Sequence, residues 1–416
     1  MKILVLSQYY EPEPIPKPGE LARDLHARGH AVTVVTGFPN YPSGQLYDGF
    51  RLAFRQRSRD GEIPVVRAFE YPYHGRNAFG RIFNYVSFML AAPLATFGLG
   101  PFDVIYVWHP PLTVGVAAWV IGLIHRAPFV YDVQDIWPEA AVLSGILRPG
   151  WVVNALRVVE RFVYRRADHV LVPTEEARAN LIGKGVPPDR VTALPHWIDE
   201  RLFDAAAASE RDALRSSLGW SDRFVVLFTG NIGLVQGLET VIEAASHVNE
   251  RDVILSFVGD GADRSRLQAM ASKSGVGNRV QFIDRQPVDR MPAYMAAADA
   301  LLVHLRASPL SRTVIPTKTM SYLAAGRPIL MAMEGAAGEL VHRAGAGIVV
   351  PSGDPGALAS AVDSLARLPP AARQQLGSNG RAYLLTHLTK SSVLPRYNDL
   401  LARVGGQTGA APCDAS

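Results

Sequence analysis

A lysine stands at the start of an expected helix in the stretch VIPTKTMSYLAAGRPIL, residues 314–330. Pro316 before this segment and Gly326 after it predict a helix over residues 317–325. The first turn of a helix exposes free N–H groups and carries partial positive charge, so Lys318 has the wrong sign for an empty helix. Lys318 is therefore either a solvent-exposed surface residue or a cation placed for an anionic ligand.

Two glycine clusters follow expected strands in the same half of the chain. Residues 230–233 read GNIG after RFVVLFT, and residues 259–261 read GDG after DVILSFV. Glycines at such turns let backbone amides approach a phosphate or a ribose, because no side chain intervenes. Tight turns use the same residues, so neither cluster alone establishes a ligand site.

Two well-known nucleotide-binding patterns are missing. The first expected strand is followed by SQYYEPEPIPKPG and not by GxGxxG, which argues against a dehydrogenase. The pattern GxxxxGK[ST] is also absent, which removes a P-loop enzyme from consideration.

The elements that must position these residues alternate along the chain. Short apolar runs such as ILVL, AVTVVTG and DVIYVW are separated by longer segments with a period near 3.6, and a second such series begins near Phe224. This rhythm predicts an α/β protein with doubly wound parallel sheets, whose ligands bind where strands end. We expect a hinge near residues 196–203 and four parts: two facing Rossmann-like domains over residues 1–200 and 201–388, a helix over 389–405 that crosses back to the first domain, and a tail over 406–416.

Composition limits the class of protein. The 416 residues are 48% hydrophobic and 19% charged, which is typical of a globular chain long enough for two domains. The net charge of +4 and the pI near 9.1 favour anionic partners such as phosphates or an acidic membrane surface. Cys413 is the only cysteine, so no disulfide framework or cysteine-based metal site is expected. The N-terminus lacks a secretory apolar segment, and we expect a cytoplasmic protein.

One segment is nearly apolar for its whole length. Residues 82–99, from Ile82 to Leu99, approach the roughly twenty residues of a membrane-spanning helix, but Pro93 interrupts them. A helix buried against the sheet is the favoured interpretation. The alternative is a helix lying in a membrane interface, since Arg76 and Arg81 precede it and are suited to anionic headgroups.

Several stretches together resemble one family. They are SQYYEPEP followed by ELARDLHARGHAVTVVTGFPNYPSG, then DVQDIWPEAAVLSGIL, TGNIGLVQGLETVIEAA, FVGDGADRSRLQAMA, IPTKTMSYLAAGRPIL and GAGIVVPSGDPGALA. In this order and spacing, over about 400 residues, the chain resembles the family-4 retaining glycosyltransferases of the GT-B fold. Within that family it is similar to transferases that build bacterial surface polysaccharides of the O-antigen, capsule and colanic-acid types.

The resemblance implies a nucleotide-sugar site in the second domain. Lys318 would then lie beside the donor diphosphate, which a helix N-terminus also attracts. Relatives pair an arginine and a lysine against the diphosphate where this chain has Asn231 and Gln236, and their paired glutamates would fall on Thr313 and Ser321. Positive charge must therefore come from Lys318 and Arg306. The donor-binding residues implied are Gly230, Asn231, Gly233, Gln236, Gly259, Arg285, Arg306, Thr313, Lys318 and Ser321.

The same resemblance implies an acceptor site in the first domain. Asp135 and Glu139 in DVQDIWPE are the carboxylates expected in the cleft, with Trp137 as part of its wall, and with Lys318 they are the candidate catalytic residues. Asp135 is equally suited to cap a helix that starts at Pro138. The remaining acceptor-side candidates are Lys17 and Gly19, in a proline-stiffened loop, and His109, a residue type that is more often structural.

The function implied is transfer of a hexosyl or acetamidohexosyl group (EC 2.4 class) from a nucleotide sugar to a saccharide acceptor, and we expect that acceptor to be lipid-linked. A UDP-sugar is favoured over a GDP-sugar, and the enzyme would work at the inner face of the cytoplasmic membrane. No cofactor and no metal is implied, because fixed positive groups would stabilise the leaving diphosphate. Two alternatives stay open: a catalytically weakened homologue that binds a nucleotide sugar or a partner enzyme, and a GT-B sugar-nucleotide epimerase.

Overall fold

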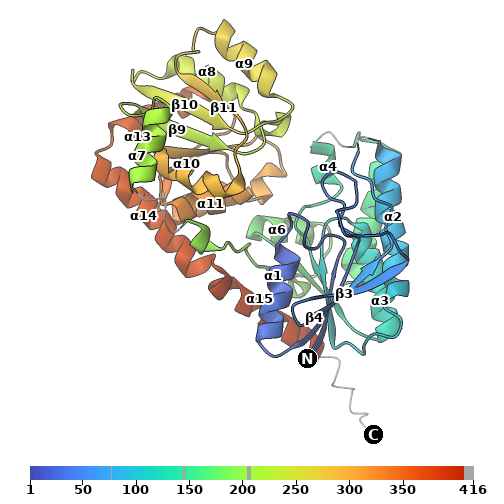
Figure 1. Cartoon of the computed structure of the whole chain (residues 1–416). Helices are drawn as coiled ribbons and strands as arrows, with labels where there is room; N and C mark the ends of the chain where they lie inside the picture. The colour runs from blue at the N-terminus through green and yellow to red at the C-terminus, as the bar shows by residue number, and fades with distance from the viewer. Residues whose placement is uncertain (76, 144–146, 204–207, 407–416) are drawn as a thin grey trace. The chain divides into compact units, whose positions relative to one another are not determined.

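The structure is a computed structural model that describes residues 1–75, 77–143, 147–203 and 208–406. Arg76 and Cys413, both discussed above, lie outside the described residues. The chain divides into two compact units (Figure 1). Unit 1 comprises Met1–Pro173, Ala177–Leu194 and the chain from Leu394 onward, and unit 2 comprises Thr174–Glu176 and Pro195–Val393.

Unit 1 is built on an eight-stranded sheet with the order β3-β4-β2-β1-β5-β6-β7-β8. All neighbouring strands are parallel except β3 and β4, which form an antiparallel hairpin at one edge. Central strands such as VIYVW are buried on both faces, which is why they read as continuous apolar runs. The strands are β1 (Lys2–Ser7), β2 (Ala31–Thr36), β3 (Arg55–Asp60), β4 (Ile63–Ala68), β5 (Val104–Trp108), β6 (Phe129–Asp132), β7 (His169–Val172) and β8 (Val191–Ala193).

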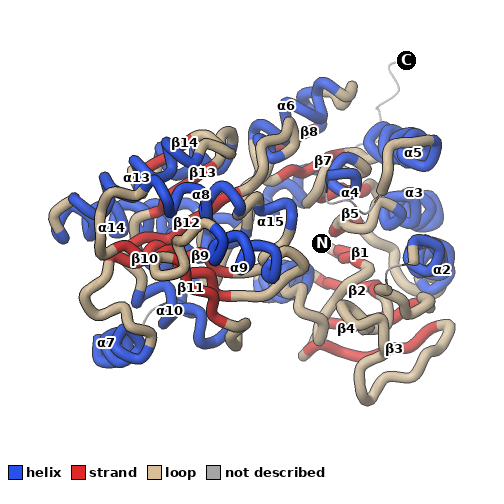
Figure 2. The backbone as a smooth tube through the Cα atoms, turned by 90° about the horizontal axis from the view of Figure 1, so that it is seen from above, coloured by secondary structure: helices blue, strands red, loops and turns tan. Residues whose placement is uncertain are grey.

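Three helices of unit 1 form one layer. Helices α2, α3 and α5 lie side by side along the same face of the sheet (Figure 2). The helices of this unit are α1 (Lys17–Ala27), α2 (Ala78–Ala95), α3 (Thr113–His125), α4 (Glu139–Leu143), α5 (Trp151–Arg166) and, from Ala177 onward, α6 (Glu175–Gly183), with a 3-10 turn η1 (Pro188–Arg190).

Unit 2 is built on a six-stranded parallel sheet with the order β11-β10-β9-β12-β13-β14. Successive side chains along each strand point alternately into two hydrophobic cores. Leu227 and Leu301 face one core, and Val226 and Leu302 face the other. The strands are β9 (Phe224–Thr229), β10 (Val253–Val258), β11 (Val280–Ile283), β12 (Ala300–His304), β13 (Ile329–Ala332) and β14 (Gly347–Val350).

Helices cover both faces of the second sheet. Helices α7, α10, α11 and α12 contribute to the first core, whereas α8, α9 and α13 contribute to the second. The elements are α7 (Ala208–Ser217), α8 (Glu239–His247), α9 (Arg264–Lys273), α10 (Met291–Ala297), α11 (Thr317–Ala325), α12 (Ala336–Arg343), α13 (Pro355–Arg367), α14 (Pro370–His387) and the 3-10 turns η2 (Glu200–Phe203), η3 (Leu234–Gln236), η4 (Val288–Arg290) and η5 (Ser311–Thr313). Helix α15 (Lys390–Gly406) begins in unit 2 and belongs to unit 1 from Leu394 onward.

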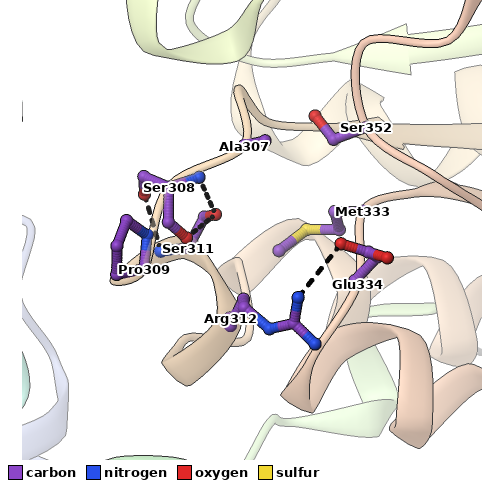
Figure 3. A pocket seen from close by; sticks show the side chains of 8 residues that line it. All are labelled: Ala307, Ser308, Pro309, Ser311, Arg312, Met333, Glu334 and Ser352. Carbon is purple, nitrogen blue, oxygen red and sulfur yellow. Dashed lines mark hydrogen bonds and ion pairs between the residues drawn. The ribbon is translucent and has the colours of Figure 1, made fainter.

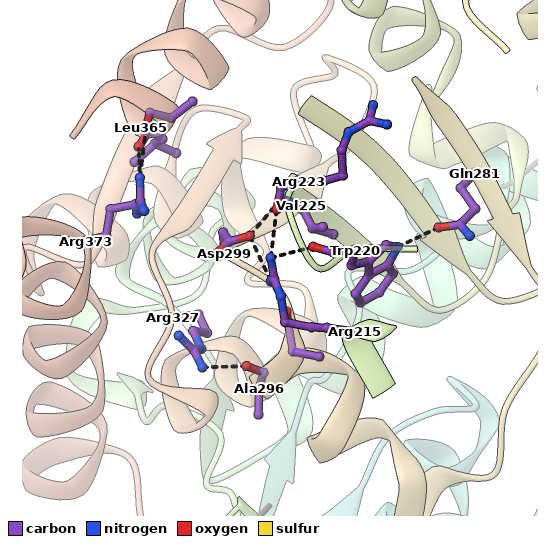
Figure 4. A network of polar contacts seen from close by, with 12 residues as sticks. Arg215, Trp220, Arg223, Val225, Gln281, Ala296, Asp299, Arg327, Leu365 and Arg373 are labelled. Carbon is purple, nitrogen blue, oxygen red and sulfur yellow. Dashed lines mark hydrogen bonds and ion pairs between the residues drawn. The ribbon is translucent and has the colours of Figure 1, made fainter. Parts of the chain in front are cut away.

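A buried arginine closes the amino edge of the second sheet (Figure 4). Arg215 of α7 donates to the Ala297 carbonyl at 2.7 Å and to Asp299 Oδ2 at 3.0 Å. It also donates to the carbonyl oxygens of Trp220 and Arg223, each at 2.8 Å. A buried charge needs such complete pairing, so this edge is a structural polar cluster.

The doubly wound α/β architecture expected from the sequence is confirmed, and so is the helix from Thr317 to Ala325, which ends at a left-handed Gly326. Two expectations were wrong in part. Lys17 and Gly19 lie in the first turn of α1 and not in a loop, because Pro18 is well suited to an opening helical turn. The apolar run forms α2, but only one side of that helix is buried against the unit.

Candidate functional site

The candidate site lies at the carboxyl edge of the six-stranded sheet. Strand order reverses between β9 and β12, and open parallel sheets bind ligands at such a switch point. A cavity of about 550 Å³ opens beside it. The residues that line it end or follow β9, β10 and β11: Thr229, Gly230, Asn231, Val258, Gly259, Asp260, Gly261, Arg285, Gln286, Val288 and Met291. Four residues predicted from the sequence, Gly230, Asn231, Gly259 and Arg285, therefore come together.

The glycines are required by close backbone contact between the two turns. A Cβ on Gly259 would lie 1.9 Å from the Gly230 carbonyl oxygen, and the φ of Gly259 is +149°. A Cβ on Gly261 would lie 2.3 Å from the Ile232 carbonyl oxygen. No other residue type fits without moving the backbone, so these turns keep their amides close to the cavity.

Lys318 points toward this edge from the first turn of α11. Its Nζ lies 3.5 Å from the centroid of the Phe228 ring, in a cation–π contact. It also lies 3.4 Å from Gln236 Oε1, and a Cβ built on Gly230 would be 3.6 Å from it. Lys318 is partly buried, which argues against the alternative of a solvent-exposed surface lysine.

The ammonium of Lys318 has no acidic partner. Among the described residues, no carboxylate lies within ion-pair distance of it. Burial lowers the pKa of Lys318 to about 7, since the charged form is poorly solvated there. A half-buried cation without a counter-ion, at a helix start and beside glycine amides, is suited to an anionic ligand.

A short turn positions Gln236 beside Lys318. The turn η3 ends at Gln236, whose carbonyl oxygen lies 2.6 Å from His304 Nδ1. The other ring nitrogen of His304, Nε2, is buried without a partner, and burial lowers the pKa of this imidazole. Gln236 thus contacts both the histidine and the lysine, through its backbone and its side chain respectively.

Arg306 is engaged in an ion-pair network. Its Nη2 lies 2.5 Å from Glu239 Oε1, and Arg266 Nη2 lies 3.1 Å from the other oxygen of the same carboxylate. Arg266 also pairs with Asp263 at 2.5 Å. Arg306 was expected to supply free positive charge, but Glu239 neutralises it in this structure. Lys318 is therefore the stronger candidate for the anion.

Thr313, in the turn η5 before α11, and Ser321, within α11, replace the expected carboxylates. Thr313 is buried, and its hydroxyl donates to the Leu310 carbonyl at 2.8 Å. Ser321 is partly buried one turn beyond Thr317, and its hydroxyl has no hydrogen-bond partner in the described part of the chain. Of the two, only Ser321 offers an uncommitted hydroxyl group.

A second cavity, of about 410 Å³, lies where β12, β13 and β14 end (Figure 3). Arg312 Nη1 approaches Glu334 Oε2 at 3.3 Å across it, and Ser308 and Ser311 hydrogen-bond to each other at 2.9 Å. Its lining residues are Ala307, Ser308, Pro309, Ser311, Arg312, Met333, Glu334 and Ser352. The polar lining is rich in hydroxyl, carboxylate and guanidinium groups, which are suited to sugar hydroxyls.

In unit 1, the two predicted carboxylates differ in environment. Asp135 is exposed, its carboxylate has no hydrogen-bond partner in the described residues, and it does not cap α4. Protein atoms around it partly remove it from water and raise its pKa. Glu139 instead pairs with Lys184 at 3.1 Å and Arg157 at 3.3 Å. Burial alone would raise the pKa of Glu139, but its helix-start backbone bond and Lys184 outweigh burial and lower it.

These contacts change the roles assigned from sequence. The ion pairs of Glu139 favour a structural role, so Asp135 is the better acceptor-side candidate. His109 is buried, its Nδ1 has no partner, and burial lowers its pKa to about 3, so it is neutral near pH 7. Trp137 is partly buried beside Asp135 in the chain. Gly19 packs inside α1, where a Cβ would lie 3.0 Å from Glu11 Oε1.

Sequence reasoning missed several residues of these sites. Phe228 is an ordinary strand residue by pattern, and nothing in the sequence shows that its ring faces Lys318. His304 and Glu239 were also missed, although both stand at ends of elements that border the glycine turns. Asp132 was missed as well: it is buried, accepts a hydrogen bond from Tyr106 at 2.5 Å, and burial raises its pKa to about 7. In the described residues, no group of three or more His, Cys, Asp or Glu is arranged to hold a metal ion.

Comparisons with known proteins fit this geometry. Residues 18–197 match the family described as a glycosyl transferase 4-like domain, and residues 210–383 match glycosyl transferases group 1. The putative colanic acid biosynthesis glycosyl transferase WcaI of Escherichia coli K12 is 30% identical over 341 residues, which cover 78% of this chain and 82% of WcaI. The chain belongs to the group 1 glycosyltransferases. Like the group, this glycosyltransferase uses a nucleotide-sugar donor and retains anomeric configuration.

Two further relatives bear on this glycosyltransferase. The probable glycosyltransferase WbjE of Pseudomonas aeruginosa is 28% identical, over 58% of this chain and 60% of WbjE. The crystal structure of HepE from Anabaena, in complex with UDP and glucose, superposes with a TM-score of 0.71 over 97% of this chain and 99% of HepE, at 21% identity. The likeness to HepE establishes the GT-B fold. Family membership favours a transferase over the epimerase that the sequence left open.

Proposed function

We propose that this glycosyltransferase moves a hexosyl or acetamidohexosyl group from a UDP-sugar to a saccharide of a bacterial surface polysaccharide or glycolipid. The observation that carries the proposal is the half-buried ammonium of Lys318, which lies beside the glycine turns with no acidic partner among the described residues. Support for UDP comes from HepE, which has the same fold and was crystallised with UDP and glucose. Support for the pathway comes from WcaI, whose name refers to colanic acid biosynthesis.

The donor is proposed to lie along the carboxyl edge of the second sheet. The nucleoside occupies the 550 Å³ cavity near Arg285, where Gly230 and Gly259 bring backbone amides close to it. The diphosphate lies against Lys318 and the amides near Gly233. Ser321 is placed to hydrogen-bond a donor hydroxyl, although a neutral hydroxyl binds less strongly than a carboxylate.

The proposed chemistry is a front-side displacement. An acceptor hydroxyl oxygen forms a bond to the anomeric carbon on the face from which the diphosphate leaves, and the bond between that carbon and the phosphate oxygen breaks. The hydroxyl proton passes to the leaving diphosphate. Charge grows on that group during the reaction, so Lys318 lowers the barrier by stabilising it. Asp135 is proposed to bind the acceptor through its exposed carboxylate.

A weakened, nucleotide-sugar-binding homologue is the second candidate function. It is motivated by the missing carboxylates at Thr313 and Ser321 and by the committed hydroxyl of Thr313. The two candidates differ in donor turnover, because transferases slowly pass sugar to water whereas a binding module leaves the donor intact. Release of UDP from UDP-sugars without acceptor therefore supports the transferase, and an intact donor supports the binding module.

The acceptor is proposed to be linked to a polyprenyl lipid, and the enzyme to work peripherally at the inner face of the cytoplasmic membrane. None of the described helices is both long and apolar enough to cross a bilayer. The test begins with a thermal-shift screen of UDP- and GDP-sugars, because a tight ligand raises the melting temperature by mass action. The stabilising donor is then assayed with lipid-linked and free saccharides, and no transfer to either kind of acceptor would refute the proposal.

A further inference from the structure

Helix α2 presents an apolar face to the outside of unit 1. Phe79 is 82% exposed, Phe83 56% and Leu90 61%, and their spacing places them along one side of the helix. The opposite side, with Phe88 and Ala92, is fully buried. Exposed apolar patches of this extent mark interaction sites in globular proteins. Eighteen residues give the helix a length of about 27 Å.

Neighbouring elements continue this face. Leu123 at the end of α3 is 62% exposed, and Trp151 at the start of α5 is 81% exposed. Helices α2, α3 and α5 form one layer (Figure 2), and the high exposure of Leu123 and Trp151 puts both residues at the surface of that layer. Phe54, before β3, is also exposed, and Arg55 donates to the Phe97 carbonyl at the end of α2 at 2.9 Å. We call the outer side of α2, α3 and α5 the apolar face.

The exposed charged side chains of α2, α3 and α5 are basic. Arg81 is the only charged residue of α2, and α3 contains none apart from His125. On α5, Arg161 and Arg165 are exposed and line a cavity of about 140 Å³ together with Lys184 and Arg190.

The acidic residues near the layer already have ion-pair or hydrogen-bond partners. The only acidic residue of α5, Glu160, is buried and pairs with Lys184 at 2.6 Å. Asp103 and Asp168 follow α2 and α5 in the chain, and each accepts a backbone N–H, from Lys2 and Phe129 respectively. The apolar face is therefore bordered by arginines whose charge is not cancelled by exposed carboxylates of the same helices.

We propose that the apolar face docks on an anionic phospholipid bilayer, with a lipid phosphate bound at Arg161 and Arg165. Aromatic and aliphatic side chains then enter the interface, and the arginines meet the headgroups. A second copy of the chain would offer the same basic surface, with no exposed acid of these helices to pair with it. The proposal rests on the membrane-linked acceptor proposed above and identifies the surface that reaches that acceptor.

Vesicle sedimentation tests the proposal with the full chain and no sugar nucleotide. The vesicles are 30% phosphatidylglycerol in phosphatidylcholine, compared with phosphatidylcholine alone, at low and high salt. The double variant Phe79→Ser/Leu90→Ser removes apolar area at sites that contribute little to the fold. Its control is Leu385→Ser, an exposed leucine of α14 in unit 2. The double variant Arg161→Glu/Arg165→Glu is compared with Arg343→Glu of α12.

We expect the unmodified protein to sediment with the anionic vesicles at low salt. The serine pair should weaken binding at every salt concentration, and the glutamate pair should weaken it at least 25-fold at low salt, since each arginine contributes about fivefold. The two controls should bind normally. Equal binding by all variants would overturn the proposal. So would a dimer in sedimentation equilibrium that the serine pair dissociates, because the face would then join two copies. Transfer to a soluble acceptor is assayed separately, so docking can fail while the proposed enzymatic function stands.

Discussion

The environment of Lys318 predicts a specific pH dependence of donor binding. In the empty enzyme the pKa of Lys318 is lowered to about 7 by burial, so about half of the molecules carry the ammonium at pH 7. The donor diphosphate binds the charged form, which raises the pKa toward the ordinary value near 10.4 in the complex. Above pH 7, binding must therefore take up a proton, and the affinity must fall as the pH rises.

The size of the effect follows from the two pKa values. Between pH 7 and pH 8.5 the charged fraction of the empty enzyme falls from about one half to about 3%, so the dissociation constant rises about 15-fold. At pH 6.5, where the charge is mostly present, Lys318→Ala should weaken binding by roughly ten- to a hundredfold through loss of a charge-assisted contact. Lys318→Ala should also abolish the pH dependence. Lys318→Arg keeps its charge at every pH and should bind with little pH dependence.

Isothermal titration calorimetry measures both the donor affinity and the number of protons taken up on binding. Titrations of a UDP-sugar in buffers of different ionisation enthalpy report the protons taken up, which should be close to one at pH 8 and near zero for Lys318→Ala. A UDP-sugar is used because its diphosphate does not titrate in this range. An affinity that does not change between pH 7 and pH 8.5, or the same pH trend in Lys318→Ala, would refute the assignment of Lys318 to the diphosphate.

Three further substitutions test other parts of the site. Asp135→Asn should leave the free energy of unfolding unchanged, because the Asp135 carboxylate has no partner among the described residues. The same substitution should lower kcat/KM for the acceptor at least tenfold. A loss of stability with full activity would show that Asp135 has a structural role. Glu139→Gln should lower the free energy of unfolding by up to about 1 kcal/mol in urea titrations with little loss of transfer, and a hundredfold loss would restore a catalytic role. Gly259→Ala should cost about 1–3 kcal/mol and reduce UDP affinity, because its Cβ would meet the Gly230 carbonyl oxygen at 1.9 Å; native affinity would show that the turns relax freely.

Local chemistry made part of the fold and site predictable. The Pro316 and Gly326 signals set the limits of α11, because an X-Pro step and a left-handed glycine mark helix ends. The glycine turns after β9 and β10 were also predictable, since strands and turns have separate compositions. These are short-range features, whereas the expectation that Lys318 lies beside a donor diphosphate came from the family resemblance.

Long-range partners were not predictable in the same way. The ring under Lys318 belongs to Phe228, 90 positions earlier, and an aromatic residue in a strand is ordinary core by pattern. The neutralisation of Arg306 by Glu239 likewise depends on the contact between the segment after β12 and the start of α8. The exposed side of α2 could not be predicted for another reason. The helix is apolar on nearly all sides, so its sequence pattern does not indicate which side packs against the sheet.

The central claim is that this chain transfers a sugar from a nucleotide donor with Lys318 against the diphosphate. Proton NMR of UDP-sugars mixed with enzyme and acceptor follows donor loss, UDP release and the anomeric configuration of the product in one experiment. The predicted result is conversion of an α-linked donor into an α-linked product by the unmodified enzyme, with turnover strongly reduced in Lys318→Ala. An inverted product, or equal turnover by the unmodified enzyme and Lys318→Ala, would contradict it.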